Sequence, residues 1–182
     1  MIINLRGTSG AGKSYLVRHI MTMFSITEEV FCRGRKQPLY YILRNKDEGR
    51  DLAVLGHYNT PCGGCDTISK TQDVFDLVMK NHNAGRDVLF EGVIIGYETK
   101  RTKDLPDLRI VFLTTNTDIC VDSINERRRA RGQMEPVNPK NTIAKHRQCV
   151  GARIKFLEMG NIQVFSANRN DASVLVEEML GL

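Results

Sequence analysis

The sequence predicts an α/β fold, with a mostly parallel sheet of five main strands and helices on both faces. Short apolar segments alternate with segments of helical periodicity along the whole chain. Parallel strands joined by crossover helices give this pattern. The 182 residues are 41% hydrophobic and 26% charged, an ordinary composition for a protein with a sizeable core. We therefore expect one domain that spans residues 1–182.

The chain begins with a predicted strand, a glycine-rich loop and a helix. Residues 1–6 are an apolar run typical of a buried strand, and residues 15–24 have helical periodicity. The eight residues between them, here called the glycine loop, fit G-x-x-x-x-G-K-[ST]: Gly7, Thr8, Ser9, Gly10, Ala11, Gly12, Lys13 and Ser14. This motif needs a strand before it and a helix after it, and the sequence predicts both. The segment therefore indicates ATP binding together with Mg²⁺.

The chemistry of the glycine loop follows from its residue types. Glycines let the backbone curl until successive N–H groups point into one hollow, where they bind phosphate. Lys13 is expected to reach the β- and γ-phosphates, and the Ser14 hydroxyl is expected to hold Mg²⁺. The alternative is a glycine-rich turn that binds nothing, and the full spacing with its flanking elements argues against it.

The next segments predict a connection and a hairpin. Residues 25–36 are polar and contain Arg33, Arg35 and Lys36. They are either a solvated surface loop or a basic lip that contacts the substrate, and we expect these three cations to bind substrate if the second reading holds. Residues 39–43 and 52–55 are strand-like and a charged turn separates them, which predicts a hairpin whose second arm joins the main sheet.

Residues 56–68 follow a predicted strand end, where open α/β sheets bind their ligands. The stretch is rich in glycine but contains His57, Tyr58 and Asp66. We expect His57 and Tyr58 to contact the substrate, although a single histidine is more often structural. Asp66 is a candidate catalytic base. Its alternative role is to cap the following helix.

A second acidic candidate ends a buried strand. Residues 70–84 predict a helix, and residues 87–93 predict an apolar strand that contains Glu91. Because a buried strand rarely carries a glutamate for packing reasons, Glu91 is expected to face Mg²⁺, directly or through water. Asp66 and Glu91 can also exchange the roles of base and metal ligand.

The second half of the chain predicts an arginine-rich lid. Residues 109–115 read as a core strand, followed by a helix that starts at Thr117 or Asp118 and ends in an arginine cluster at Arg131. The cluster is either a solvated helix end, which suits the helix dipole, or part of a lid over residues 127–141. In the lid reading, Arg127 and Arg131 contact the triphosphate.

The remaining segments complete the pattern of alternating elements. Pro136 and Pro139 indicate a loop, and a helix is expected to start at Asn141 or Thr142. A last strand over residues 162–166 and a C-terminal helix follow. The order of the elements is that of a P-loop kinase-like fold.

Charge and composition narrow the classes of partner and location. The net charge of +5 favours anionic partners, either nucleotide or nucleic acid. No segment reaches the length of a membrane span, and a strand at the very start leaves no room for a signal peptide, so we expect a cytoplasmic protein. Five cysteines indicate free thiols. The Cys62–Cys65 spacing has no second ligand pair, which favours small thiols in a turn over a zinc site.

Several of these segments together resemble the 5-hydroxymethyluracil DNA kinases, a family of small phage P-loop kinases. The resemblance rests on the glycine loop, on Gly56-His57-Tyr58 to Gly63-Gly64-Cys65-Asp66-Thr67, on Phe90-Glu91-Gly92 and on the arginine helix. It implies ATP-dependent phosphorylation of the hydroxymethyl group of 5-hydroxymethyluracil in phage DNA, a step in thymidine hypermodification. DNA that contains this base would then be the partner, and the enzyme would work in the cytoplasm of the host.

Two other functions stay open at this point. The predicted sheet and lid also resemble phage polynucleotide kinase and nucleoside monophosphate kinases, so the alternative is a kinase of nucleoside monophosphates or other small molecules. A non-enzymatic ATP-binding module is a third reading. Lys13, Ser14 and the two carboxylates argue against it, because pure binding does not require them all.

Overall fold

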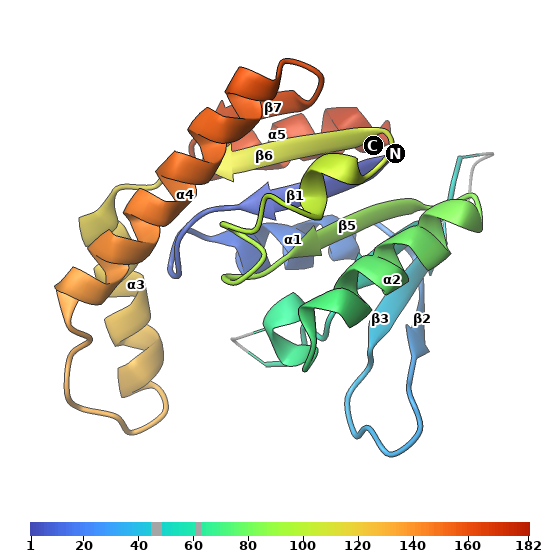
Figure 1. Ribbon diagram of the computed structural model, residues 1–182. Coiled ribbons are helices and arrows are strands. Elements are labelled where there is room, and N and C mark those ends of the chain that lie inside the picture. The colour runs from blue at the N-terminus through green and yellow to red at the C-terminus, as the bar shows by residue number, and fades with distance from the viewer. Residues whose placement is uncertain (45–48, 61–62) are drawn as a thin grey trace.

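A twisted sheet forms the middle layer of the protein (Figure 1). The computed structural model describes residues 1–44, 49–60 and 63–182. Within these residues the sheet has seven strands in the order β2-β3-β4-β5-β1-β6-β7. Neighbours from β4 to β7 run parallel, and β3 is antiparallel to both β2 and β4. The bounds are β1 Ile2–Arg6, β2 Ile26–Val30, β3 Tyr40–Arg44, β4 Leu52–Leu55, β5 Asp87–Glu91, β6 Leu108–Leu113 and β7 Gln163–Ala167.

The prediction of five main strands is wrong, because the described part of the sheet has seven. The predicted hairpin is confirmed: β3 pairs antiparallel with β4, and β4 joins β5. The unexpected strand is β2, which lies in the segment predicted as a polar connection and pairs with β3 at the edge of the sheet. No apolar alternation marks β2 as a strand, because Thr27, Glu28 and Glu29 are polar. Charged side chains are common on edge strands, where they discourage pairing with other chains.

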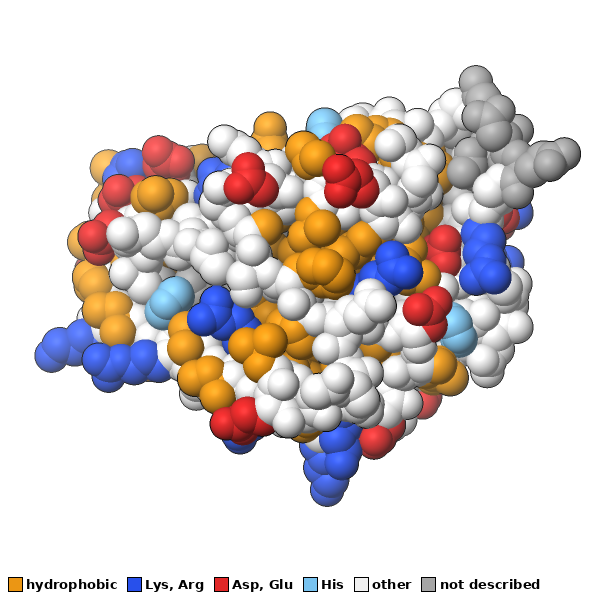
Figure 2. All heavy atoms as spheres, turned by 90° about the horizontal axis from the view of Figure 1, so that it is seen from above, with side chains coloured by type: hydrophobic (Ala, Val, Ile, Leu, Met, Phe, Trp, Pro, Cys, Tyr) orange, Lys and Arg blue, Asp and Glu red, His pale blue; other side chains and the backbone are white. Residues whose placement is uncertain are grey.

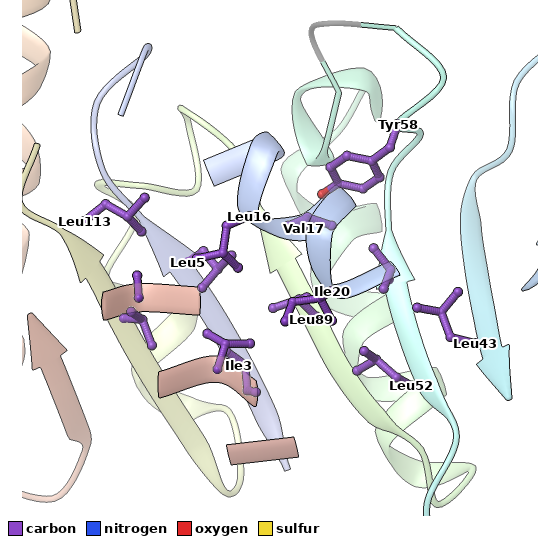
Figure 3. Close-up of a cluster of buried hydrophobic side chains, with 14 of the residues drawn as sticks. Ile3, Leu5, Leu16, Val17, Ile20, Leu43, Leu52, Tyr58, Leu89 and Leu113 are labelled. Carbon is purple, nitrogen blue, oxygen red and sulfur yellow. The ribbon is translucent and has the colours of Figure 1, made fainter. Parts of the chain in front are cut away.

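Helices cover both faces of the sheet, as the sequence predicts. Residues of α1 (Lys13–Thr22) and α5 (Arg169–Leu180) pack into one buried cluster with Ile3 and Leu5 of β1 (Figure 3). Residues of α2 (Thr71–Asn83) and α4 (Pro139–Met159) pack with Ile2 on the opposite face. The two clusters separate because side chains alternate between the faces of a strand.

Three short or peripheral elements complete the description. The helix α3 (Thr117–Arg129) packs against α4, and Figure 1 shows α3 at the left of the sheet and α4 running from beside α3 toward β7. Two single-turn helices, η1 (Cys65–Thr67) and η2 (Thr102–Asp104), follow β4 and β5 in the chain. None of the described helices combines the length and the apolar character that crossing a bilayer requires.

Asparagine side chains start three of the helices. Asn116, Asn138 and Asn168 each accept backbone N–H groups from the first turn of α3, α4 and α5. The predicted start of α4 at Asn141 or Thr142 is therefore late, since Pro139 already belongs to the helix. Proline is compatible with the first turn because the N–H that it lacks has no partner inside the helix there.

A buried cation lies directly before the glycine loop. The Arg6 side chain is fully buried and donates hydrogen bonds to the Glu98 carbonyl at 2.7 Å and the Thr102 hydroxyl at 2.8 Å. Its guanidinium lies 4.7 Å from the centre of the Phe156 ring. Desolvation lowers the pKa of Arg6 to about 9, so the group remains charged at neutral pH. Arg6 thus fastens the segment after β5 to the strand that leads into the glycine loop.

Candidate active site

The glycine loop connects the end of β1 to the start of α1 and is tightly packed. Gly7, Gly10 and Gly12 have φ values of +147°, +82° and +103°, a region that favours glycine. A Cβ atom at Gly10 would lie 2.3 Å from the carbonyl oxygen of Cys120 on α3. The loop therefore needs glycine at this position both for its backbone conformation and for its contact with α3.

Lys13, Ser14 and Glu91 come together at the end of the loop. The Lys13 ammonium is almost fully buried and donates to the carbonyl oxygens of Gly7 at 2.8 Å and Thr8 at 3.1 Å. The Ser14 hydroxyl donates to Glu91 Oε1 at 2.7 Å. A hydroxyl and a carboxylate side by side are the oxygen ligands that Mg²⁺ prefers. The residues present therefore fit the metal that the sequence implies.

Burial controls the charge of Glu91. Only 2% of this residue is exposed, and desolvation raises the pKa of its carboxyl. The positive charge of Lys13 and the hydrogen bond from Ser14 act in the opposite direction. A buried carboxylate whose charge depends on neighbouring positive groups is suited to a bound cation.

Asp66 faces the same cleft from η1 and has a well-defined set of donors. Its carboxylate accepts the N–H of Val93 at 2.8 and 2.9 Å and the N–H of Ile94 at 3.3 Å. The alternative in which Asp66 caps the following helix is wrong, because α2 begins at Thr71 with Lys70 at its N-cap position. Asp66 instead holds the backbone that follows β5, and its side chain remains exposed.

One cleft of about 720 Å³ contains most of the predicted site residues. It is lined by the glycine loop, by the two carboxylates and by the arginines at the end of α3. A second cavity of about 620 Å³ lies by Gly7 and Thr8 against α4, and its lining includes neither Lys13 nor a carboxylate. The first cleft is therefore the candidate active site. The predicted residues that line it are Ser9, Gly10, Gly12, Lys13, Ser14, Asp66, Glu91, Arg127 and Arg131.

His57 and Tyr58 do not line the cleft, contrary to the expectation of substrate contact. Both are only 5% exposed. The Tyr58 ring packs over α1 within the buried cluster (Figure 3), 6.3 Å from the Tyr41 ring. The His57 carbonyl accepts the N–H of Gly64 at 3.1 Å. These residues shape the loop that carries Asp66, and their side chains are turned inward.

The three predicted cations after β2 differ in their surroundings. Arg33 and Lys36 are exposed. Arg35 is half-buried and donates to the carbonyl oxygen of Thr67 at 2.9 Å and to its hydroxyl at 3.2 Å. Arg35 therefore braces η1, whereas Arg33 and Lys36 are available for an anionic partner.

Sequence reasoning missed two arginines of the cleft. Arg18 donates to the carbonyl oxygens of Tyr58 at 3.1 Å and Ser14 at 3.3 Å, one helical turn after Ser14, so its spacing was a usable signal. Arg169 donates to the carbonyl oxygen of Gly10 at 3.1 Å. It follows the last strand, and no local motif marks it. The Cys62 position of the C-x-x-C spacing lies outside the described residues.

Basic side chains also project from the surface on the side of α3 and α4. Lys and Arg side chains project at the left edge of the view in Figure 2, on the side where Figure 1 places α3 and α4. On the same side Arg127, Arg128 and Arg131, at and just after the end of α3, line the cleft. An anionic substrate would be attracted to this side.

The chain has a relative of nearly the same length among known proteins. The 5-hmdU DNA kinase of Pseudomonas phage PaMx11 is 43% identical over 184 residues, which cover 98% of this chain and 96% of that protein. The chain belongs to the 5-hmdU DNA kinase family. The resemblance inferred from the sequence motifs is thereby confirmed.

More distant members of the 5-hmdU DNA kinase family show weaker similarity. The 5-hmdU DNA kinases of Delftia phage PhiW-14 and Pseudomonas phage M6 are each 27% identical to this chain and cover 87% of it. The matched region makes up 65% of the protein of Delftia phage PhiW-14 and 86% of the protein of Pseudomonas phage M6. No family model matches the chain.

Proposed function

We propose that this protein transfers the γ-phosphoryl group of ATP to the hydroxymethyl group of 5-hydroxymethyluracil in phage DNA, as a step in thymidine hypermodification. The observation that carries the proposal is the convergence of Lys13, Ser14 and Glu91 in one cleft opposite Asp66. Membership of the 5-hmdU DNA kinase family supports the substrate. The family membership also disfavours the non-enzymatic alternative.

The glycine loop and Lys13 bind the triphosphate in this proposal. The backbone N–H groups of the loop and the start of α1 provide donors for the phosphate oxygens. The Lys13 ammonium, which contacts loop carbonyls in this structure, turns to the β- and γ-phosphates when ATP is bound. Ser14 and Glu91 would hold Mg²⁺, which neutralises charge on the β- and γ-oxygens when bound.

Asp66 acts on the acceptor. The acceptor hydroxyl oxygen forms a bond to the γ-phosphorus, the bond from that phosphorus to the β-bridging oxygen breaks, and ADP leaves. The proton of the acceptor hydroxyl passes to the Asp66 carboxylate. The N–H groups of Val93 and Ile94 keep that carboxylate in place. Exchange of roles between Asp66 and Glu91 is the alternative within the same mechanism.

The segment 127–141 serves as the lid. It covers the end of α3, the following loop and the first residues of α4. Arg127 and Arg131 line the cleft, where their charge can steady the transferring phosphoryl group as the lid closes. Arg33 and Lys36 contribute to holding the DNA backbone on the other side.

A direct transfer assay tests the proposal. The protein is incubated with labelled ATP and either DNA that contains 5-hydroxymethyluracil, the same DNA with thymine, or free nucleoside monophosphates. Label is expected on the modified DNA alone, and the rate should fall as salt rises because phosphate contacts release counterions. Efficient labelling of a nucleoside monophosphate, with the modified DNA untouched, would move the assignment to a small-molecule kinase.

Lys13→Ala is the matched inactive control for that assay. The substitution removes the point charge from the triphosphate and should slow transfer by about 10²–10³-fold. Its circular dichroism spectrum should equal that of the wild type. A folded Lys13→Ala protein with wild-type turnover would show that the glycine loop is not the phosphate site.

A further inference from the structure

The loop between α3 and α4 ends in an exposed tip of fixed shape. All eight residues from 129 to 136, here called the lid tip, are exposed. Their backbone is nevertheless held in place: Gln133 N–H donates to the Arg128 carbonyl at 3.0 Å, and Arg128 Nε donates to the Glu135 carbonyl at 2.8 Å. Just beyond the tip, Val137 N–H donates to Asn125 Oδ1 at 2.8 Å. The tip is thus a braced loop.

Met134 stands out on this tip. It is 77% exposed, the largest exposed fraction among the large hydrophobic side chains of the described residues. A single exposed apolar residue needs no explanation by itself. Here the residue sits on a braced backbone and next to the candidate active site, since its neighbour Gln133 lines the cleft. This placement suits an apolar side chain that acts on something outside the protein.

The charge around Met134 identifies the class of partner. Residues 127–140 contain five cationic side chains and one acidic side chain, Glu135. Apolar protein or lipid partners do not require such a surrounding, whereas a nucleic acid offers phosphates for the cations and stacked bases for the apolar side chain. Methionine is unbranched and polarisable, so it fills irregular gaps between flat surfaces.

We propose that Met134 enters the base stack of duplex DNA beside the target nucleotide while Arg129 of the lid tip contacts a flanking phosphate. The inference rests on the proposed function, since it presumes a DNA base as the acceptor. A base inside a duplex must leave the stack to reach an enclosed active site, and unstacking costs a few kcal/mol. An inserted apolar side chain replaces the lost stacking and holds the extruded nucleotide toward the cleft.

The test compares duplex with single-stranded DNA. Each oligonucleotide contains one 5-hydroxymethyluracil with 2-aminopurine next to it, whose fluorescence rises when stacking is lost. Met134→Ala should reduce the fluorescence rise on duplex binding and slow duplex phosphorylation by about tenfold or more. The rate on single strands should stay within about twofold of wild type. Met134→Leu should retain most of the duplex activity, because leucine also serves as an apolar wedge.

Ile154→Ala provides the matched control, because Ile154 is 47% exposed and lies on α4 beyond the lid segment. It should leave both DNA rates unchanged. Equal slowing of Met134→Ala on single and double strands would overturn the proposal in favour of a role in lid closure, and unchanged rates would overturn it outright. If the wild type labels neither DNA, the proposed function fails. The 2-aminopurine fluorescence of the bound duplex still reports separately on insertion. If this fluorescence does not rise on binding, the proposed insertion of Met134 is overturned.

Discussion

Ser14 and Glu91 are 77 positions apart in the chain, yet the hydroxyl of one donates to the carboxylate of the other at 2.7 Å. The parallel pairing of β1 with β5 produces this contact. In the register of these strands Leu5 lies opposite Glu91, so the end of β5 falls beside the glycine loop that follows β1. Loops at the carboxyl ends of adjacent parallel strands meet in this way throughout α/β proteins.

Substitutions of the two carboxylates should therefore have different effects. Glu91→Gln is expected to raise the Mg²⁺ concentration needed for half-maximal transfer, because a charged oxygen ligand is lost. Asp66→Asn should leave Mg-ATP affinity near wild type and slow transfer by about 10²-fold or more, because the base is lost. Rates and ATP affinities measured across Mg²⁺ concentrations separate the two effects. Asp73→Asn, an exposed acid on α2, serves as the control, and full activity of Asp66→Asn would rule out its role as base.

The buried Glu91 carboxyl should also make stability depend on pH. Its folded-state pKa is raised above the usual value of 4.5. As pH rises past 4.5 the unfolded chain releases this proton first, so the contribution of Glu91 to the free energy of unfolding decreases until the folded-state pKa has been passed. Unfolding measured without metal from about pH 4 to about pH 8 should show wild type losing stability relative to Glu91→Gln. A constant difference across that range would contradict the assignment of the shift to burial.

Substitutions of Arg35 and Arg33 should differ in their effect on the salt dependence of DNA binding. Arg35→Met removes the hydrogen bonds to Thr67 and is expected to slow transfer, with the salt dependence of DNA binding unchanged. Arg33→Ala should leave the rate on saturating DNA near wild type and reduce the slope of log K against log salt by about 0.9, the value for one lost phosphate contact. Binding isotherms at several salt concentrations give both slopes. A reduced slope for Arg35→Met would indicate that Arg35 contacts a DNA phosphate.

Gly10→Ala should show how closely the glycine loop is packed. Gly10 and Gly85 have similar positive φ values, +82° and +80°, so alanine is strained at both by about 1–2 kcal/mol. Only Gly10 has a carbonyl oxygen 2.3 Å from the position of a Cβ, whereas nothing lies within 4 Å at Gly85. Gly10→Ala is therefore expected to lose more unfolding free energy and also ATP affinity. Equal losses in both variants would indicate that backbone strain alone matters.

The sequence was most informative where the signal is local. The glycine loop, the hairpin and Glu91 at a strand end all follow from residue type and spacing within a short window. The strand β2 was missed because an edge strand can carry charged residues, so it lacks the apolar alternation by which a core strand is recognised. His57 and Tyr58 were assigned to the substrate because residue type does not reveal which way a side chain points, and Arg169 was missed because only the folded chain brings it to Gly10.

The fastening of Arg6 to Glu98 and Thr102 has a mechanical consequence. It ties residues 98 and 102 to β1, and the same guanidinium contacts Phe156 of α4, so these three parts are expected to move as one body. Domain closure uses hinges at the ends of elements that are less firmly tied. The hinge of the proposed lid is therefore expected in the loop between α3 and α4, before the part of α4 that contacts Arg6. During catalytic turnover the sheet and the body of α4 are then expected to stay in place while the lid segment moves.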